Sequence, residues 1–75
     1  EGYKGDVDKQ MRAADAEVVA GAPEKAFDRL IETMKATAGD EKARVRERLL
    51  ELFGLFEGND PRVMEARTKL ASALY

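Results

Sequence analysis

The chain has 75 residues, no cysteine, histidine or tryptophan, and a formal net charge of −2 at pH 7. Its length allows one small domain, and its weakly acidic balance argues against duplex nucleic-acid binding through overall charge. The absence of cysteine and histidine excludes disulfides, thiolate metal sites and histidine-based catalysis. No apolar run approaches the roughly 20 residues of a membrane span, and no signal-peptide segment is visible.

The first two helices are predicted from apolar residues that recur at spacings of three and four. Helix one is expected from Val7 to Val19, with Asp6 or Asp8 as its N-cap and Gly21 as its stop. Pro23 suits the first position of helix two, where a missing N–H costs nothing. The inward face of helix two is expected to comprise Ala26, Phe27, Leu30, Ile31 and Met34.

The third helix has the widest apolar arc of the chain. Gly39 and Asp40 are predicted to end helix two and to cap helix three, and Leu50 and Leu55 flank its main stripe on either side. A helix that is apolar over such an arc is expected to have partners on more than one side, so this helix is predicted to be central. Its main stripe comprises Val45, Leu49, Leu52, Phe53 and Phe56.

The fourth helix is predicted to begin at Pro61, with Asp60 as its N-cap, and to continue to the C-terminus. Its inward residues are expected to be Val63, Ala66, Leu70 and Leu74. Because short connections make successive helices antiparallel neighbours, the predicted fold is all-α, with two antiparallel helical hairpins (four helices). Residues 7–75 are expected to form this single domain, and residues 1–6 are expected to be a linker remnant.

The two glycine turns suggest a repeat. Gly21 and Gly58 recur at close to the period of about 34 residues that is typical of tetratricopeptide repeats. The small residues Ala14 and Ala26 also fit that repeat, whereas its usual large aromatic positions are Gln10 and Glu17 here. The spacing therefore indicates tetratricopeptide-repeat-like hairpins.

The sequence contains no recognisable set of reactive groups. Ser72 is the only serine, and no histidine is present to activate it. The segment Gly5–Gln10 lacks the length and the later glutamate of a calcium loop. We therefore expect no enzymatic activity in this chain, and no catalytic residue, cofactor or metal site.

Two basic features have alternative interpretations. The basic residues of Glu41–Leu52 are compatible with nucleic-acid binding, but interspersed glutamates and the lack of interleaved aromatics favour a solvated helix face with i,i+3 pairs. Arg67 falls within the face of the fourth helix that should be buried. It is interpreted either as a side chain with a packed stem and a hydrated head, or as a cation that binds an acidic partner.

Three segments together resemble a known family: GAPEKAFDRLIETM, LLELFGLF and above all the terminal GNDPRVMEARTKLASALY. They are similar to the C-terminal tetratricopeptide-like helical domain of thioredoxin-fused co-chaperones, the chaperedoxin family, over nearly the whole chain. The chain departs from the family pattern at Ala22, where members usually have a polar cap. The thioredoxin-like half is absent, so the chain is expected to be a C-terminal fragment of a longer protein.

The resemblance implies a bacterial, cytoplasmic co-chaperone or holdase that binds unfolding clients and hands them to a chaperonin. The expected partners are proteins (chaperonin, unfolded clients and the thioredoxin-like domain, which can carry redox activity), with no nucleic acid and no membrane. The alternative is a structural module that docks the thioredoxin-like domain or forms a homodimer. The final helix, Pro61–Tyr75, is the element expected to contact the chaperonin. The expected partner-binding residues are Arg67, Lys69, Leu70, Leu74 and Tyr75.

Overall fold

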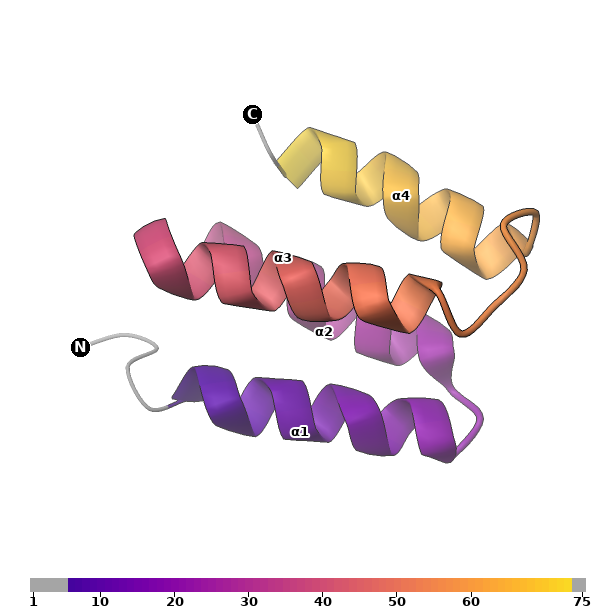
Figure 1. Ribbon diagram of the computed structural model, residues 1–75, viewed down its shortest axis with the longest axis horizontal. Helices are drawn as coiled ribbons and strands as arrows, with labels where there is room; N and C mark the ends of the chain where they lie inside the picture. The colour runs from indigo at the N-terminus through magenta and orange to yellow at the C-terminus, as the bar shows by residue number, and fades with distance from the viewer. Residues whose placement is uncertain (1–5, 74–75) are drawn as a thin grey trace.

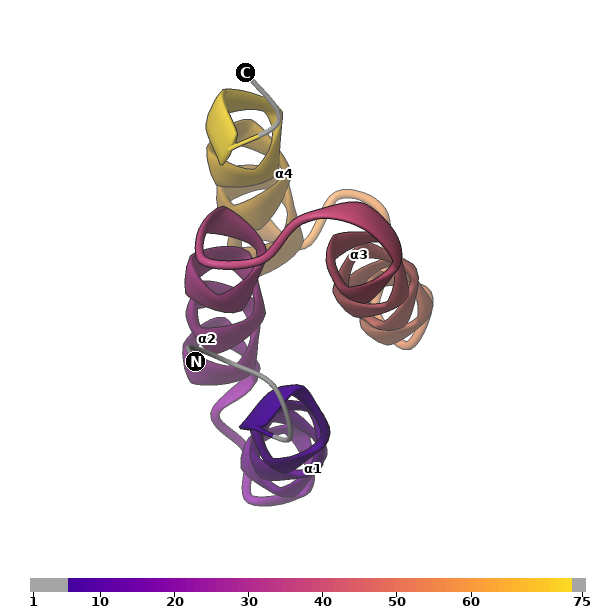
Figure 2. The same cartoon turned by 90° about the vertical axis from the view of Figure 1, so that its left-hand side faces the viewer.

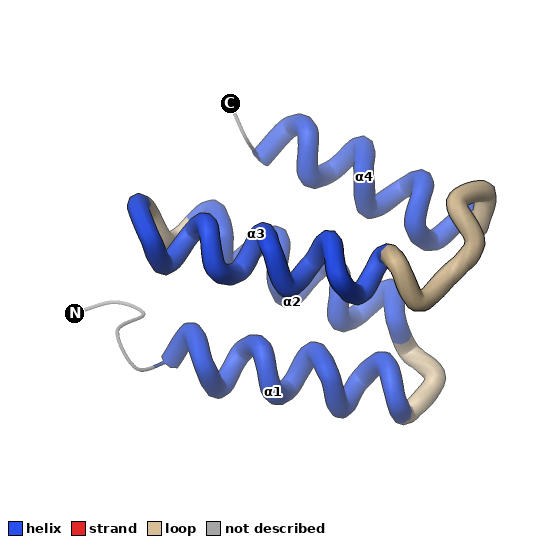
Figure 3. The backbone as a smooth tube through the Cα atoms, in the orientation of Figure 1, coloured by secondary structure: helices blue, strands red, loops and turns tan. Residues whose placement is uncertain are grey.

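The computed structural model of the chain describes residues 6–73, which form four helices and no strand (Figures 1 and 3). The helices are α1 (Asp6–Val19), α2 (Pro23–Lys35), α3 (Gly39–Phe53) and α4 (Pro61–Ala73). The predicted all-α fold of two antiparallel hairpins, α1–α2 and α3–α4, is confirmed. Within this part of the chain, no helix is both long and apolar enough to cross a membrane.

The turn between α1 and α2 is built around Gly21. Its φ of +89° lies in the left-handed region, which glycine enters without a steric cost. The N–H of Gly21 donates to the carbonyl of Val18 at 3.1 Å, and the N–H of Ala22 donates to the carbonyl of Glu17 at 2.8 Å. These are the two bonds of a Schellman motif. As predicted, Gly21 stops α1 and Pro23 begins α2, while Ala22 stands at the N-cap without a side-chain bond.

The two later helix starts differ from one another. Ala38 is the N-cap of α3 and makes no side-chain bond, and Asp40 lies in the first turn, so the prediction that Asp40 caps α3 was wrong. Gly39, with a φ of +63°, makes the bend into this helix. The cap of α4 is as predicted, because Asp60 Oδ1 accepts the backbone N–H of Arg62 at 2.9 Å.

The central helix is α2, so the prediction that the third helix is central was wrong. Figure 2 shows α1, α2 and α4 in a row with α3 against one side of it, and α2 packs on each of the other three. Leu50 of α3 and Leu55, which lies just beyond the end of this helix, widen the predicted apolar arc but are 43% and 65% exposed. The width of an apolar arc shows how much of a helix can be buried, but not whether a partner covers it.

The core is centred on Phe27 of α2. Its ring meets the ring of Phe53 edge-on at a centroid distance of 4.9 Å, and the ring of Phe56 at 5.9 Å. Such edge-on pairs add about 0.5–1.5 kcal/mol each to area burial. Because α3 ends at Phe53, Phe56 lies half-buried in the following turn rather than on the helix. The other buried apolar residues are Val7, Ala14, Ala26, Leu30, Ile31, Met34, Val45, Leu49, Leu52, Val63, Ala66 and Leu70.

The hairpin of α3 and α4 is more open than that of α1 and α2. Both of its helices pack chiefly on α2, and few backbone contacts join them to each other. Arginines of α4 instead reach aromatic rings at the end of α3: the guanidinium carbon of Arg67 lies 5.7 Å from the ring centroid of Phe53, and that of Arg62 lies 5.4 Å from that of Phe56. Cation–π contacts at such exposed sites are worth about 0.5–1 kcal/mol each.

Candidate functional site

Arg67, the first predicted partner-binding residue, is exposed on the side of α4 that is turned toward α3. The prediction that it lies within the buried face was wrong, because Val63 and Ala66, at 1% and 3% exposure, mark a buried side that excludes it. Its guanidinium rests on the ring of Phe53. This geometry matches the interpretation of a packed stem with a hydrated head.

The other predicted contact residues do not share a surface with Arg67. Lys69 faces α2, where its Nζ donates to Asp28 Oδ1 at 3.0 Å, and this hydrogen bond raises the pKa of Lys69. Leu70 is 7% exposed and belongs to the core, and its contact with a partner stays a prediction. Leu74 and Tyr75 lie outside the described residues, and their contacts stay predictions.

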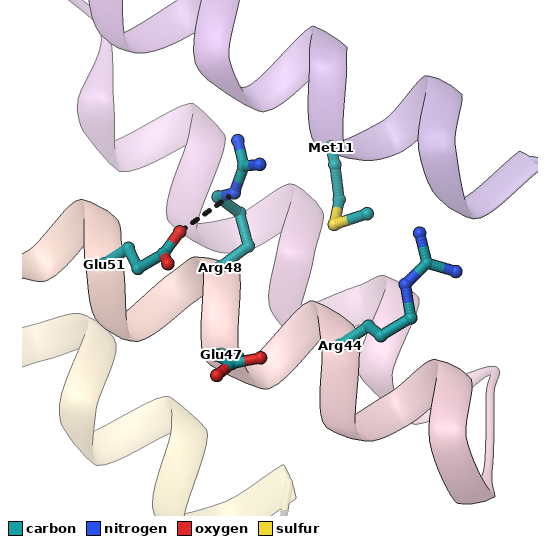
Figure 4. Close-up of a pocket in the computed structure, with 5 residues that line it drawn as sticks. All are labelled: Met11, Arg44, Glu47, Arg48 and Glu51. Carbon is teal, nitrogen blue, oxygen red and sulfur yellow. Dashed lines mark ion pairs between the residues drawn. The ribbon is translucent and has the colours of Figure 1, made fainter.

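A small pocket between α1 and α3 was not predicted from the sequence. It measures about 200 Å³ and is lined by Met11 of α1 and by Arg44, Glu47, Arg48 and Glu51 of α3 (Figure 4). Met11 projects from α1 toward α3 and is half-buried. Guanidinium, carboxylate and thioether groups bind through ion pairs, hydrogen bonds and adaptable apolar contact. Arg44, Arg48 and Glu51 are engaged in ion pairs within the chain, which leaves Glu47 and Met11 as the lining groups outside those pairs.

Two arginines beside this pocket hold α3 against α1. Arg44 Nη2 donates to Asp8 Oδ1 at 2.7 Å, and Arg48 Nη1 donates to Asp15 Oδ2 at 2.6 Å, which raises the pKa of Arg48. Arg48 also pairs with Glu51 at 3.2 Å, an i,i+3 pair of the kind predicted for this basic segment. The pairs between helices escaped prediction because their partners are 36 and 33 residues apart in the sequence.

A third arginine joins α1 to α2. Arg29 donates to both carboxylate oxygens of Glu17, at 3.0 Å and 2.8 Å, and to Gln10 Oε1 at 2.9 Å. These bonds from Arg29 lower the pKa of Glu17, with a smaller contribution from Lys25, against the opposing effect of burial. Gln10 and Glu17 are the two positions that the repeat usually fills with large aromatics. A polar bridge replaces aromatic packing there.

Antiparallel helical hairpins packed side by side are the architecture of helical-repeat proteins. The tetratricopeptide repeat family matches residues 1–75, and the chain belongs to this family. Similar proteins include the uncharacterized protein Mb1359 of Mycobacterium bovis and the uncharacterized protein Rv1324 of Mycobacterium tuberculosis, each 47% identical over 70 residues. The matched region is 93% of this chain and 23% of each relative, so the chain spans about a quarter of their length. No solved structure matches the chain.

The family assignment gives the class of function. Tetratricopeptide-like domains mediate protein–protein interaction, so protein binding is assigned to this chain at that level. The match is to the repeat family as a whole and does not distinguish the thioredoxin-fused co-chaperones within it.

Proposed function

We propose that the chain is the protein-interaction domain of a thioredoxin-like co-chaperone or holdase, which binds unfolding clients and hands them to a chaperonin. The observation that supports this proposal is the tetratricopeptide match over residues 1–75. The resemblance of the terminal segment GNDPRVMEARTKLASALY to the chaperedoxins directs it to a chaperonin. In this proposal the domain acts in the cytoplasm, by binding alone, without a catalytic group or cofactor of its own.

The proposed chaperonin-contacting element is α4 together with the residues that follow it, Pro61–Tyr75. Because α4 packs chiefly on α2, its flanks are open: Arg67 is exposed on the flank beside α3, and Lys69 is exposed on the flank beside α2. A helix with mixed apolar and basic character can lie in an apolar groove of a partner. Leu70 serves this element indirectly, since it anchors α4 in the core.

The test is direct binding of purified bacterial chaperonin to the immobilised chain. We expect the double substitution of Arg67→Glu with Lys69→Glu to weaken binding at least tenfold, because both cations of the proposed contact helix become anions. Lys69→Glu also removes the ion pair with Asp28, so the control must lose an ion pair between helices as well. The matched control is Arg12→Glu with Arg44→Glu: Arg12 is exposed and forms no ion pair within residues 7–73, like Arg67, and Arg44 is exposed and paired with Asp8 of a neighbouring helix, as Lys69 is with Asp28. It should bind as the unaltered chain does.

Two results would count against the proposal in different ways. Full binding by the α4 double variant would show that the chaperonin contacts another element. A lack of binding by the unaltered chain would remove the co-chaperone role and leave the second candidate, a docking or dimerisation module. The exposure of Leu50, Leu55 and Met64 favours that candidate, and sedimentation over a range of concentrations detects dimerisation directly.

A further inference from the structure

The exposed surface shared by α3 and α4 combines apolar and basic side chains. We define this α3–α4 face by Arg46 and Leu50 of α3 and by Met64 and Arg67 of α4. The cation–π contact of Arg67 with Phe53 joins the two helices at its centre. Leu50 lies one turn before Phe53, and Met64 lies one turn before Arg67, so both border this contact.

The apolar part of the α3–α4 face is uncovered. Leu50 is 43% exposed and Met64 is 54% exposed, and they are two of the four large hydrophobic residues that the described chain leaves exposed. The other two, Val19 and Leu55, lie at the end of α1 and beyond the end of α3. Figure 2 shows that α3 stands to one side of the row formed by α1, α2 and α4. Arg46 and Arg67 of this face are exposed as well.

The charge of the α3–α4 face is also uncompensated. Arg44 and Arg48, on the opposite flank of α3, are paired with carboxylates of α1. Arg46 and Arg67 form no ion pair within residues 7–73. Positions 42, 43, 46 and 50 of α3 and 64, 67, 68 and 71 of α4 carry no carboxylate. The neighbouring carboxylates are Glu47, three residues before Leu50, and Asp60, four residues before Met64, and Asp60 is paired with Arg62. A basic strip is thus present on a chain whose net charge is −2.

We propose that the α3–α4 face binds an amphipathic helix of another protein whose polar flanks are acidic. The molecule contains an internal precedent, since α3 lies against α1 with its arginines on Asp8 and Asp15 while its apolar stripe enters the core. On the α3–α4 face Arg46 and Arg67 take the place of Arg44 and Arg48, so the complementary helix carries the carboxylates, as α1 does. Leu50 and Met64 are the apolar contacts for residues at i, i+3 or i+4 and i+7 of that helix. This assignment rests on the proposed protein-interaction function and specifies the chemistry of its partner.

The probe is a fluorescein-labelled model peptide with leucine at helical i, i+4 and i+7 positions and glutamate on both flanks. We expect its fluorescence anisotropy to rise on titration with the 75-residue chain. The affinity should fall as salt is added, because the contacts are between charges. A peptide of the same pattern with lysine in place of glutamate should bind at least tenfold more weakly. Equal binding of the two peptides would overturn the proposal.

Variants on α3 locate the site without touching α4. We expect Leu50→Glu and Arg46→Glu each to weaken peptide binding at least tenfold. Val19→Glu and Arg12→Glu are the matched controls, because Val19 is 88% exposed and Arg12 is exposed and mid-helix. They should change binding less than twofold. All four positions are exposed, so circular dichroism should show unchanged helix content. Unchanged binding by the α3 variants would place the peptide elsewhere and overturn the proposal.

The remaining outcomes separate this proposal from the co-chaperone role. If the chain self-associates in sedimentation and Leu50→Glu abolishes this, the α3–α4 face binds a second copy of the chain. That result would overturn the proposal of an acidic helix from another protein. Chaperonin binding that survives Leu50→Glu and Arg46→Glu, with no binding of the acidic peptide, would leave the co-chaperone role standing and remove this inference. Peptide binding at the α3–α4 face without chaperonin binding would support this inference and remove the co-chaperone role.

Discussion

Arg29 makes three hydrogen bonds from α2 to α1, two to Glu17 and one to Gln10. A bidentate guanidinium–carboxylate pair is among the stronger charge-assisted contacts. The side chains of Arg29 and Glu17 are 36% and 22% exposed, so water screens their attraction. We therefore expect the pair to contribute on the order of 1 kcal/mol or less to the free energy of unfolding.

The contribution of Glu17 should depend on pH. Arg29 lowers the pKa of Glu17 below its ordinary value of 4.5 in the folded chain, so folding favours the ionised carboxylate. The stabilisation is therefore present in full when the pH is above the pKa of Glu17 in the unfolded chain. It is lost as the pH falls through the lower pKa of Glu17 in the folded chain. We expect Glu17→Gln to lower the free energy of unfolding at pH 7, and this difference to shrink on acidification below about 4.5. Urea unfolding of the unaltered chain and of Glu17→Gln at several pH values measures this difference in the free energy of unfolding.

A control separates this pair from the general loss of carboxylate charge. Glu47 is exposed and forms no ion pair within the described residues, so Glu47→Gln should change stability little at pH 7. If Glu17→Gln behaved like Glu47→Gln at pH 7, the hydrogen bonds from Arg29 would contribute nothing to the hairpin. The sequence showed only that positions 10 and 17, which the repeat usually fills with large aromatics, are polar here. Their shared partner Arg29 was found because α2 packs against α1.

At the scale of the elements, glycine determines where α1 stops. Gly21 has a φ of +89°, and a Cβ added there would meet nothing within 4 Å. The cost of Gly21→Ala is therefore conformational rather than steric. A left-handed backbone costs a non-glycine residue roughly 1–2 kcal/mol. We expect this variant to be destabilised by about 1 kcal/mol and to melt about 4–8 °C lower, as measured by circular dichroism.

Gly58 provides the matched comparison for Gly21. A Cβ at Gly58 also meets nothing within 4 Å, but its φ is not positive. Gly58→Ala should therefore leave the melting temperature nearly unchanged. Equal effects of the two substitutions would show that the left-handed turn is not the reason for glycine at position 21, although the sequence patterns of the two turns resemble each other.

The local features of the helices were the most predictable part of the fold. Apolar spacing and the residue types at Gly21, Pro23 and Asp60 identified where helices stop and start, because these signals act within one turn of the chain. Asp40 was assigned wrongly, since an aspartate one residue beyond a glycine can either cap a helix or lie in its first turn. The backbone conformation of Gly39 decides between them, and it is not encoded in the residue type alone.

At the scale of the molecule, the arrangement of helices was less predictable than their existence. The apolar arc of α3 suggested a central helix, but Leu50 remained exposed while Thr33 of α2 became buried. The hydroxyl of Thr33 donates to the carbonyl of Arg29 at 2.8 Å, which satisfies it in the core. Likewise, the pocket beside Arg44 and Arg48 depends on partners from another helix. Such features follow from packing rather than from local pattern.

The central position of α2 should control how the chain opens. Removing α2 breaks its packing with three helices, so its amides should exchange with solvent only through global unfolding. Because α4 packs chiefly on α2, its detachment should leave α1, α2 and α3 together. We expect native-state hydrogen exchange to give the highest opening free energy at buried positions of α2, such as Leu30, and a lower one at Leu70. If amides of α3 outlasted those of α2, the third helix would be the stable centre after all. A single value for every helix would mean instead that the two hairpins unfold as one unit.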